Sequence, residues 1–404
     1  QDRRDEPAGS CPTNCGLSSM KIIRFETFLA NAGLRNYLFF RLHTDTGLSG
    51  IGEATLEWQE KTVETLAHEW VEKRVLGRDP FDVEAVGGGM IRDQYQGGAT
   101  IMTAISGVEI ALWDIIGKAC GQPVYRLLGG RLRETLSAYA NGWYGGAKTP
   151  ADYAERARDV VARGYSAMKF DPFGTAWKEL SADESDAAVE IVAKVREAVG
   201  PRVDLMVEFH GRLSAGCAVS TIRRLEKYAP AWCEEPVAPE QIDLLADVKR
   251  QVSVPIAAGE RLYTLADFDR LTSTRAADVV QMDIAHCGGI SAAKKIAAMA
   301  EVRDIRVAPH CSIGPVALAA ALHFDMSTPN FMIQEAFGEF DVPWRNPLVR
   351  GWNPLAGGRF RISDAPGLGL ELDEQVIAEH PYLPNAFPSL WDTGWLDDFT
   401  RSRT

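Results

Sequence analysis

Between residues 137 and 335 the sequence alternates eight short runs of β-branched, aromatic and small apolar residues with longer helical stretches. Each of the eight runs closes on a polar residue. This alternation predicts an α/β fold with a parallel (β/α) barrel, in which all carboxyl ends of the strands meet at one mouth. The closing residues, which we expect to converge there, are Asn141, Asp171, Glu208, Glu234, Glu260, Asp283, His310 and Glu335.

The helical stretches between these runs begin with residues that favour helix starts. Serine and threonine side chains accept hydrogen bonds from the free N–H groups of a first turn, and proline suits the first helical position. The expected starts are Thr149-Pro150, Ser214, Pro239-Glu240, Thr264 and Gly314-Pro315.

The segment before the barrel has a different pattern. Residues 20–55 predict three strands, with a hairpin turn at 44–47, and residues 61–118 predict helices that stop at Gly121. We therefore expect an α+β unit at 20–132, the barrel at 133–345 and a wrapping C-terminal segment at 346–404. Residues 1–19, which contain Cys11 and Cys15, have no periodicity and predict a flexible extension.

Composition excludes several classes of function. The net charge is −12, and the chain has no basic stripe, which argues against nucleic-acid binding. No apolar run reaches the roughly 18 residues that a membrane span needs. The seven cysteines are scattered and do not form a disulfide pattern. Because no targeting segment is recognised, we expect a cytoplasmic protein.

Three of the strand-end residues predict a metal site. Glu208, Glu234 and Glu260 close neighbouring strands of the predicted barrel. Three carboxylates that point into one mouth repel each other unless a cation lies between them. Oxygen-only ligands favour Mg²⁺, and Mn²⁺ can replace it.

Two histidines lie at the same mouth. Asp283 and His310 close adjacent strands, and a carboxylate beside an imidazole fixes its tautomer and raises its basicity. This pair is a candidate general base. His210 is two residues from Glu208, so strand alternation would place both side chains on one face. Lys169 suits a charge partner of the carboxylates better than a Schiff-base lysine, because acidic neighbours favour its charged form.

Several motifs resemble the enolase superfamily, in particular its mandelate racemase subgroup and the sugar-acid dehydratases of the galactonate type. The resemblance extends over residues 20–404. The motifs that carry it are EFHGR (208–212), CEEPV (233–237), AAGERL (257–262), QMD with CGGIS (281–291), APHCSIGP (308–315) and IQE (333–335), together with ALWDIIGK (111–118) and LLGG (127–130). The resemblance implies a (β/α)7β barrel with an N-terminal α+β capping domain that the C-terminal segment completes. It also implies a homo-oligomer, from dimer to octamer.

The resemblance also implies roles for particular residues. Glu208, Glu234 and Glu260 would bind Mg²⁺, and His310 with Asp283 would be the base. His210 would be the acid, and Glu335 would hydrogen-bond the substrate carboxylate. The remaining expected site residues are Lys169 near the metal ligands and the substrate contacts Asp171, Arg261, Trp58 and Trp143.

The implied reaction is dehydration of an acid sugar such as galactonate or gluconate to a 2-keto-3-deoxy acid. This sequence departs from the galactonate pattern at Glu208, where those enzymes carry aspartate, in the KFDPFG stretch (169–174), and in the capping loop around 30–36 and Trp58. Alternatives are a racemase, epimerase or cycloisomerase on the same scaffold, a Schiff-base aldolase that uses Lys169, and a protein that binds sugar acids without turnover.

Overall fold

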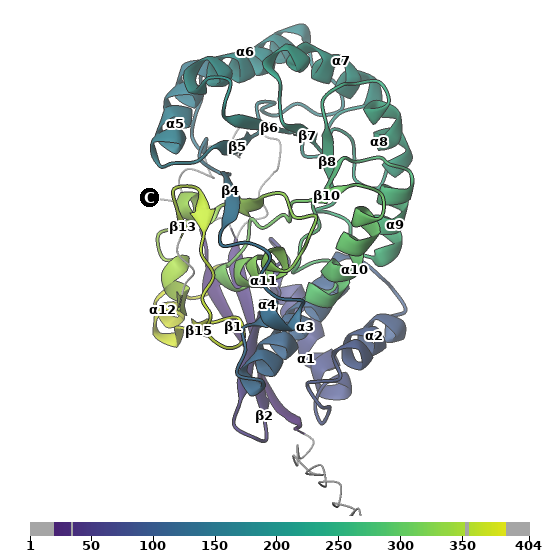
Figure 1. Cartoon of the computed structure of the whole chain (residues 1–404), viewed down its shortest axis with the longest axis vertical. Helices are drawn as coiled ribbons and strands as arrows, with labels where there is room; N and C mark the ends of the chain where they lie inside the picture. Colours follow the sequence, from purple (N-terminus) through teal and green to yellow (C-terminus); the bar gives the residue numbers. More distant parts are fainter. Residues whose placement is uncertain (1–19, 34, 352–354, 385–404) are drawn as a thin grey trace, which may run out of the picture.

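A computed structural model describes residues 20–33, 35–351 and 355–384. Within them, eight parallel strands form a barrel, ordered β10-β9-β8-β7-β6-β5-β4 with β11 against β4. A parallel bridge between Val307 and Phe331 closes the ring. The fold class predicted from the sequence is confirmed (Figure 1). The strands are β4 (Leu136–Ala140), β5 (Ala167–Phe170), β6 (Asp204–Glu208), β7 (Trp232–Glu234), β8 (Ile256–Ala258), β9 (Val279–Val280), β10 (Arg306–Val307) and β11 (Gln334–Ala336).

Helices fill the seven connections between these strands and surround the barrel (Figure 1). Thr149, Ser214 and Thr264 cap their helices as predicted. The start predicted at Pro239-Glu240 is wrong: that helix begins at Ile242, without a side-chain cap. The helices are α5 (Pro150–Ala162), α6 (Ala182–Val199), α7 (Ala215–Leu225) with the 3-10 turn η1 (Glu226–Tyr228), α8 (Ile242–Lys249), α9 (Leu265–Ser273), α10 (Gly289–Glu301) and α11 (Pro315–Met326).

A second unit, drawn in purple and blue, lies beside the barrel (Figure 1). Its antiparallel sheet packs on helices around a separate apolar core. The elements are β1 (Ile22–Asn31), β2 (Asn36–Thr44), β3 (Ser49–Glu53), α1 (Glu60–Arg74), α2 (Val83–Asp93), α3 (Ala99–Ala119) and α4 (Val124–Leu127). Among the described residues, α3 alone is long and apolar enough to cross a membrane, and 78% of its apolar window is buried in the fold.

The C-terminal segment contacts both units. Strand β14 adds to the barrel strand β4, and helix α12 packs on β1 of the capping sheet. The elements are η2 (Gly338–Phe340), η3 (Asn346–Leu348), β12 (Val349–Arg350), β13 (Leu355–Ala356), β14 (Arg359–Phe360), β15 (Glu371–Leu372) and α12 (Glu374–Glu379). The expected boundaries at 132 and 345 stay predictions. The expected extension at 1–19, with Cys11 and Cys15, lies outside the described residues.

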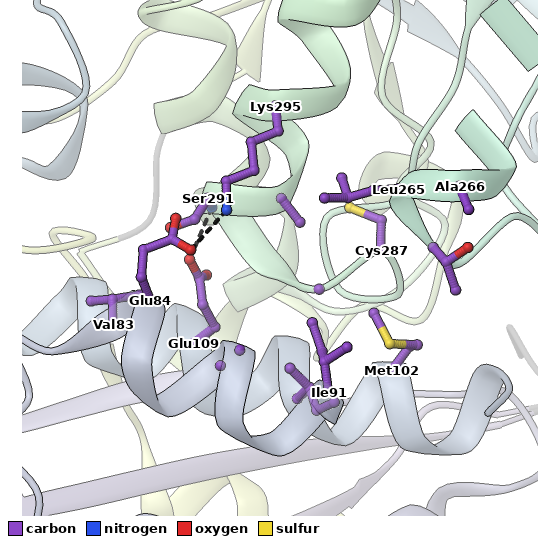
Figure 2. A pocket seen from close by; sticks show the side chains of 16 residues that line it. Val83, Glu84, Ile91, Met102, Glu109, Leu265, Ala266, Cys287, Ser291 and Lys295 are labelled. Atoms are coloured by element: carbon purple, nitrogen blue, oxygen red, sulfur yellow. Dashed lines mark hydrogen bonds and ion pairs between the residues drawn. The ribbon is translucent and has the colours of Figure 1, made fainter. Parts of the chain in front are cut away.

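The capping unit and the barrel meet where α2 and α3 approach α9 and α10. A cavity of about 390 Å³ lies at this junction, lined mainly by apolar side chains such as Met102, Ile105 and Leu265. The pair Lys295–Glu84 lies at 2.7 Å, and Figure 2 shows Glu109 of α3 pointing towards Ser291 of α10. The junction is therefore apolar but contains a buried carboxylate.

The contact between β3 and α3 depends on glycine. A Cβ at Gly52 would overlap the backbone oxygen of Gly107. We predict that Gly52→Ala lowers the free energy of unfolding by roughly 1–3 kcal/mol or more, because backbone atoms must move apart. The matched control is Gly89→Ala in α2, where the added Cβ meets nothing within 4 Å. That change should raise stability by up to about 1 kcal/mol. Urea denaturation measures both, and equal stability of the two variants would contradict the packing.

Candidate active site

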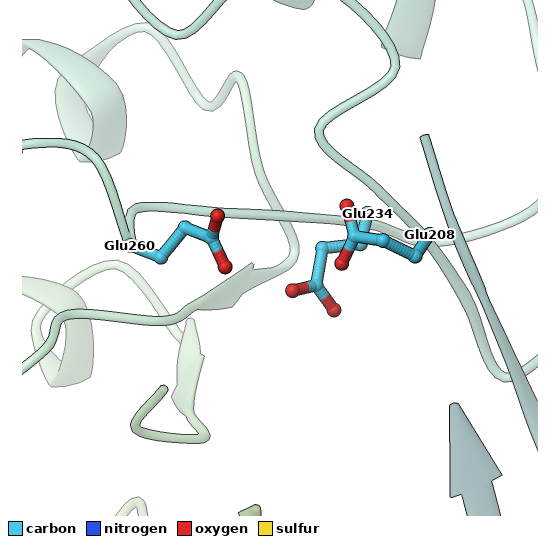
Figure 3. A group of neighbouring side chains, drawn as sticks. All are labelled: Glu208, Glu234 and Glu260. Carbon is cyan, nitrogen blue, oxygen red and sulfur yellow. The ribbon is translucent and has the colours of Figure 1, made fainter. Parts of the chain in front are cut away.

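The three predicted metal ligands lie together at the carboxyl ends of β6, β7 and β8. Glu208 and Glu234 are paired residues of the parallel ladder, and Glu260 follows β8 by two residues. One carboxylate oxygen from each residue lies within 4.8 Å of the others (Figure 3). The sequence-predicted cluster therefore exists as a compact group at the barrel mouth, where parallel-barrel enzymes bind substrate.

Burial and mutual repulsion act strongly on these carboxylates. Burial raises the pKa of Glu208 to about 7, and the charge of Glu260 adds to the shift. Burial and the charge of Glu208 raise the pKa of Glu234 well above its usual value. Burial also acts to raise the pKa of Glu260, but His310 and Lys169 outweigh it and lower the pKa to about 2. The cluster therefore needs positive charge to stay ionised.

Lys169 supplies part of that charge. Its buried ammonium lies 2.6 Å from Glu234 Oε1, 3.2 Å from Glu208 Oε2 and 3.2 Å from Glu335 Oε1. Burial alone would lower the pKa of Lys169, but these carboxylates raise it well above its usual value. A lysine held in this charged form is a poor nucleophile. The geometry matches the expected charge partner.

The donor set fits a hard divalent cation. All three residues present carboxylate oxygens, the ligands that Mg²⁺ prefers. Glu208 Oε2 is buried and accepts no hydrogen bond among the described atoms, although Lys169 lies 3.2 Å away. Lys169 carries one positive charge beside three carboxylates of this cluster, so a further cation would reduce the repulsion that remains. Glu208, Glu234 and Glu260 are thus able to hold a metal ion.

His310 and Asp283 form the predicted pair. His310 Nδ1 lies 2.7 Å from Asp283 Oδ2, and His310 Nε2 lies 3.4 Å from Glu260 Oε2. Burial would lower the pKa of His310, but Glu260, Glu335 and the hydrogen bond to Asp283 raise it well above its usual value. Asp283 Oδ1 also accepts from the Ala285 N–H at 2.7 Å, which fixes the carboxylate. The imidazole is therefore oriented through Nδ1, with Nε2 towards the carboxylate cluster.

Glu335 is a buried residue of β11, the last strand of the barrel in sequence. Its Oε2 accepts from the Cys311 N–H at 2.7 Å, and its Oε1 accepts from Asn141 Nδ2 at 2.7 Å. Burial acts to raise the pKa of Glu335, but Lys169 and His310 outweigh it and lower the pKa. Glu335 is therefore an anion that ties β10, β4 and the lysine together.

His210 lies in a second imidazole–carboxylate pair. Its Nδ1 is 2.6 Å from Asp171 Oδ2. Strand β6 ends at Glu208, and His210 has a left-handed φ of 49°, so the strand alternation used to place its side chain does not apply. A different contact keeps it at the mouth: its backbone N–H donates to Glu208 Oε1 at 2.8 Å.

The second pair depends on a residue that sequence reasoning missed. Arg212 is fully buried, donates to Asp171 Oδ1, and also donates to the Gly174 carbonyl at 2.7 Å. Burial acts to raise the pKa of Asp171, but Arg212 and His210 lower it. The only signal in the sequence was the place of Arg212 in the EFHGR stretch. Its burial could not be read from that place.

The expected substrate contacts are engaged elsewhere. Both carboxylate oxygens of Asp171 already have partners. Oδ2 lies 2.6 Å from His210 Nδ1, and Oδ1 accepts from Arg212 and from the Phe173 N–H, the latter at 2.9 Å. This geometry favours orientation of His210 over contact with a substrate hydroxyl.

The other three expected contacts also have protein partners. Trp143 is 4% exposed and donates to the Lys169 carbonyl, so its side chain is part of the core. Arg261 Nε donates to Glu235 Oε2 at 2.7 Å. The Trp58 N–H donates to Glu60 Oε1 at 3.2 Å.

Comparisons with known proteins agree with this geometry. A family model described as the mandelate racemase / muconate lactonizing enzyme N-terminal domain matches residues 24–129, and one described as enolase C-terminal domain-like matches 152–376. A D-galactonate dehydratase of Variovorax paradoxus (strain S110) is 38% identical over 89% of this chain and 94% of its own length. The D-galactonate dehydratase of Ralstonia pickettii (strain 12J) is 37% identical over the same shares.

Solved structures give the same result. The mandelate racemase/muconate lactonizing enzyme from Jannaschia sp. CCS1 superposes with a TM-score of 0.85 at 32% identity, over 91% of this chain and 99% of the other. The enzyme of the same description from Sulfitobacter sp. has a TM-score of 0.85 at 33% identity, over 91% and 97%. The resemblance inferred from the strand-end motifs is thereby confirmed, and this chain belongs to the mandelate racemase and muconate lactonizing enzyme group of the enolase superfamily.

Proposed function

We propose that this chain is a Mg²⁺-dependent hydro-lyase that removes water from an aldonic acid and yields a 2-keto-3-deoxy acid. The observation that carries the proposal is the pair of aspartate-bound imidazoles, His310 and His210, beside one carboxylate cluster. A dehydration needs a base for the C2 proton and an acid for the leaving hydroxyl. The names of the relatives, D-galactonate dehydratase, support the same reaction.

In this proposal Glu208, Glu234 and Glu260 hold Mg²⁺, with Mn²⁺ as a substitute. The ion, when bound, supplies positive charge for the substrate carboxylate and for the negative charge that develops as the C2 proton leaves. Lys169 remains a partner of Glu234 and Glu208 and limits their repulsion. The expected hydrogen bond from Glu335 to the substrate carboxylate would need a protonated Glu335, whereas Lys169 and His310 favour its anion; we therefore assign Glu335 to holding Lys169 and His310 at the mouth.

His310 takes the C2 proton in this mechanism. The charge of Glu260 is the largest cause that raises the pKa of His310, and a cation bound by Glu260 would offset that charge. Asp283 accepts a hydrogen bond from Nδ1, so the neutral imidazole would then carry its lone pair on Nε2, the atom that faces the cluster. Proton removal leaves an enediolate of the substrate. Asp283 then stabilises the imidazolium that forms.

His210 completes the elimination as the general acid. Its imidazolium, held by Asp171, donates a proton to the 3-hydroxyl as the C3–O bond breaks, and water leaves. The enol that remains tautomerises to the 2-keto acid. A racemase would use the same base but would return the C2 epimer, and a Schiff-base aldolase would need the neutral Lys169 that its three carboxylate partners oppose.

The ligand that follows from this proposal is a small-molecule acid sugar. An assembly from dimer to octamer and a cytoplasmic location remain predictions that accompany the reaction.

The first experiment is a screen of stereoisomeric aldonic acids and diacids, galactonate and gluconate included, with Mg²⁺. We expect 2-keto product, read by semicarbazide absorbance, from one or two stereoisomers, and loss of product with EDTA because the three glutamates then lack their cation. Excess Mg²⁺ added after EDTA is the control and should restore the rate. Product formation that EDTA does not affect would contradict the metal role, and a C2 epimer as the only product would favour the racemase.

The base is tested by isotope exchange. In D₂O, His310→Asn should abolish exchange of the C2 proton of the active substrate, because asparagine cannot accept the proton. The measurement is the C2–H signal by proton NMR. Retained exchange at the wild-type rate would move the base to another residue.

The acid is tested by separating exchange from elimination. His210→Asn should lower the dehydration rate on the order of 10²-fold or more, because the hydroxyl then leaves unprotonated. Exchange of the C2 proton should persist, since His310 is intact. Normal dehydration by this variant would remove His210 from the mechanism.

A further inference from the structure

Six of the seven barrel helices begin in one of two ways, and the seventh, α8, begins after Gln241 without a side-chain cap. Helices α5, α6, α7 and α9 begin after a threonine or serine whose side chain accepts a hydrogen bond from the first turn. Helices α10 and α11 begin after Gly288 and Gly314, which have no side chain to do this. The first N–H groups of a helix need acceptors when they are buried. The acceptors for α10 and α11 come from the capping unit.

Glu53, the last residue of β3, is the acceptor for α11. Its Oε1 accepts from the Gly314 N–H at 2.6 Å, and its Oε2 accepts from Val316 and Ala317 at 3.1 and 2.9 Å. The Thr55 hydroxyl donates to Oε1 at 2.8 Å. The carboxylate is fully buried, and burial raises the pKa of Glu53; these donors and the positive end of the helix offset part of that effect.

Glu109 of α3 does the same for α10. Its Oε2 accepts from the Ile290 N–H at 2.7 Å, and its Oε1 accepts from Ser291 at 2.9 Å. Trp113 Nε1 adds a third hydrogen bond at 2.8 Å. Figure 2 shows Glu109 reaching across the junction of the two units.

The glycines of the two motifs make room for these carboxylates. A Cβ at Gly314 would overlap the Glu53 carboxylate, and a Cβ at Gly289 would overlap that of Glu109. Gly289 also has a positive φ of 87°, which favours glycine. The packing of the two carboxylates therefore explains why glycine occupies positions 289 and 314, without any role in substrate binding.

Both capped helix starts follow the base pair within a few residues. Asp283 lies five residues before Gly288, the N-cap of α10, and His310 lies four residues before Gly314, the N-cap of α11. Further contacts from the capping unit hold the same two loops. His286 Nε2 lies 2.8 Å from the Thr55 carbonyl, and the Gly288 N–H donates to Ser106 at 2.9 Å.

The loop after His310 is held in the same way. Arg35 donates to the Ser312 carbonyl at 2.6 Å. Arg345, from the C-terminal segment, donates to the carbonyls of Ile313 and Gly314. The two loops of the base pair are therefore fixed from outside the barrel as well as by its strands.

We propose that Glu53 and Glu109 are positioning residues for the base pair: by capping α11 and α10 from the capping unit, they set the position of His310 against Asp283. This inference rests on the proposed function, in which His310 is the base. Small displacements of a catalytic group are costly in rate, so loss of either cap should act on the chemical step more than on substrate binding.

The test compares Glu53→Gln and Glu109→Gln with Asp114→Asn. Asp114 is the matched control, because it is also fully buried and also accepts backbone N–H groups, those of Ile51 and Leu368. Neither group belongs to α10 or α11. All variants are compared as full chains with Mg²⁺, at a temperature where each is folded.

We expect Glu53→Gln and Glu109→Gln each to lower kcat about tenfold or more, with KM and the Mg²⁺ dissociation constant unchanged. Asp114→Asn should lower Tm but leave kcat unchanged. Hydrogen–deuterium exchange should speed up at 311–317 in the first variant and at 284–291 in the second. In the control it should speed up at Ile51 and Leu368, whose N–H groups Asp114 accepts, and stay unchanged at 311–317 and 284–291.

Wild-type kcat in both glutamine variants would overturn the inference, as would an equal fall of kcat in Asp114→Asn. If Glu53→Gln does not fold, Thr55→Val removes one donor to Glu53 and should lower kcat in the same direction, and an unchanged kcat would again overturn it. If the wild-type chain turns over no substrate, the proposed function fails. The local exchange pattern then still decides whether the two caps hold these loops.

Discussion

Repulsion among Glu208, Glu234 and Glu260 is the constraint on which the mouth of this barrel depends. Their ligand oxygens lie within 4.8 Å of one another, and the burial of Glu208 and Glu234 removes water that would screen the charges. Lys169 offsets part of the charge from inside the barrel, and His310 contacts Glu260 from the side. Lys169 and His310 are therefore held in place by the glutamate charges, and the same charges favour the binding of a cation.

The imidazoles of His210 and His310 are oriented in the same way. Each binds an aspartate through Nδ1, and each aspartate is fixed by further donors, Arg212 for Asp171 and a backbone N–H for Asp283. Strands place these residues at one mouth, but the loops after the strands set their angles. The capping unit contacts the loops after Asp283 and His310 through two buried carboxylates, Glu109 and Glu53. The geometry of the base pair therefore depends on both units.

The sequence was sufficient for the barrel, for the three glutamates and for the pairing of His310 with Asp283, because strand alternation and strand-end position are local signals. It failed where partners are remote. Glu53 and Gly314 are 261 residues apart, and Glu109 and Ile290 are 181 apart, so no local pattern links them. Trp143 was judged by residue type and position, and Arg212 was missed, whereas burial decides the roles of both.

The claim that the three glutamates form a cation site is tested most directly by calorimetric titration of the chain with Mg²⁺. The account predicts one binding site per chain, lost in Glu234→Gln, which removes one ligand charge while the Trp232 Nε1 hydrogen bond to this side chain can remain. Binding that is unchanged in this variant, or no binding to the wild-type chain, would contradict the account.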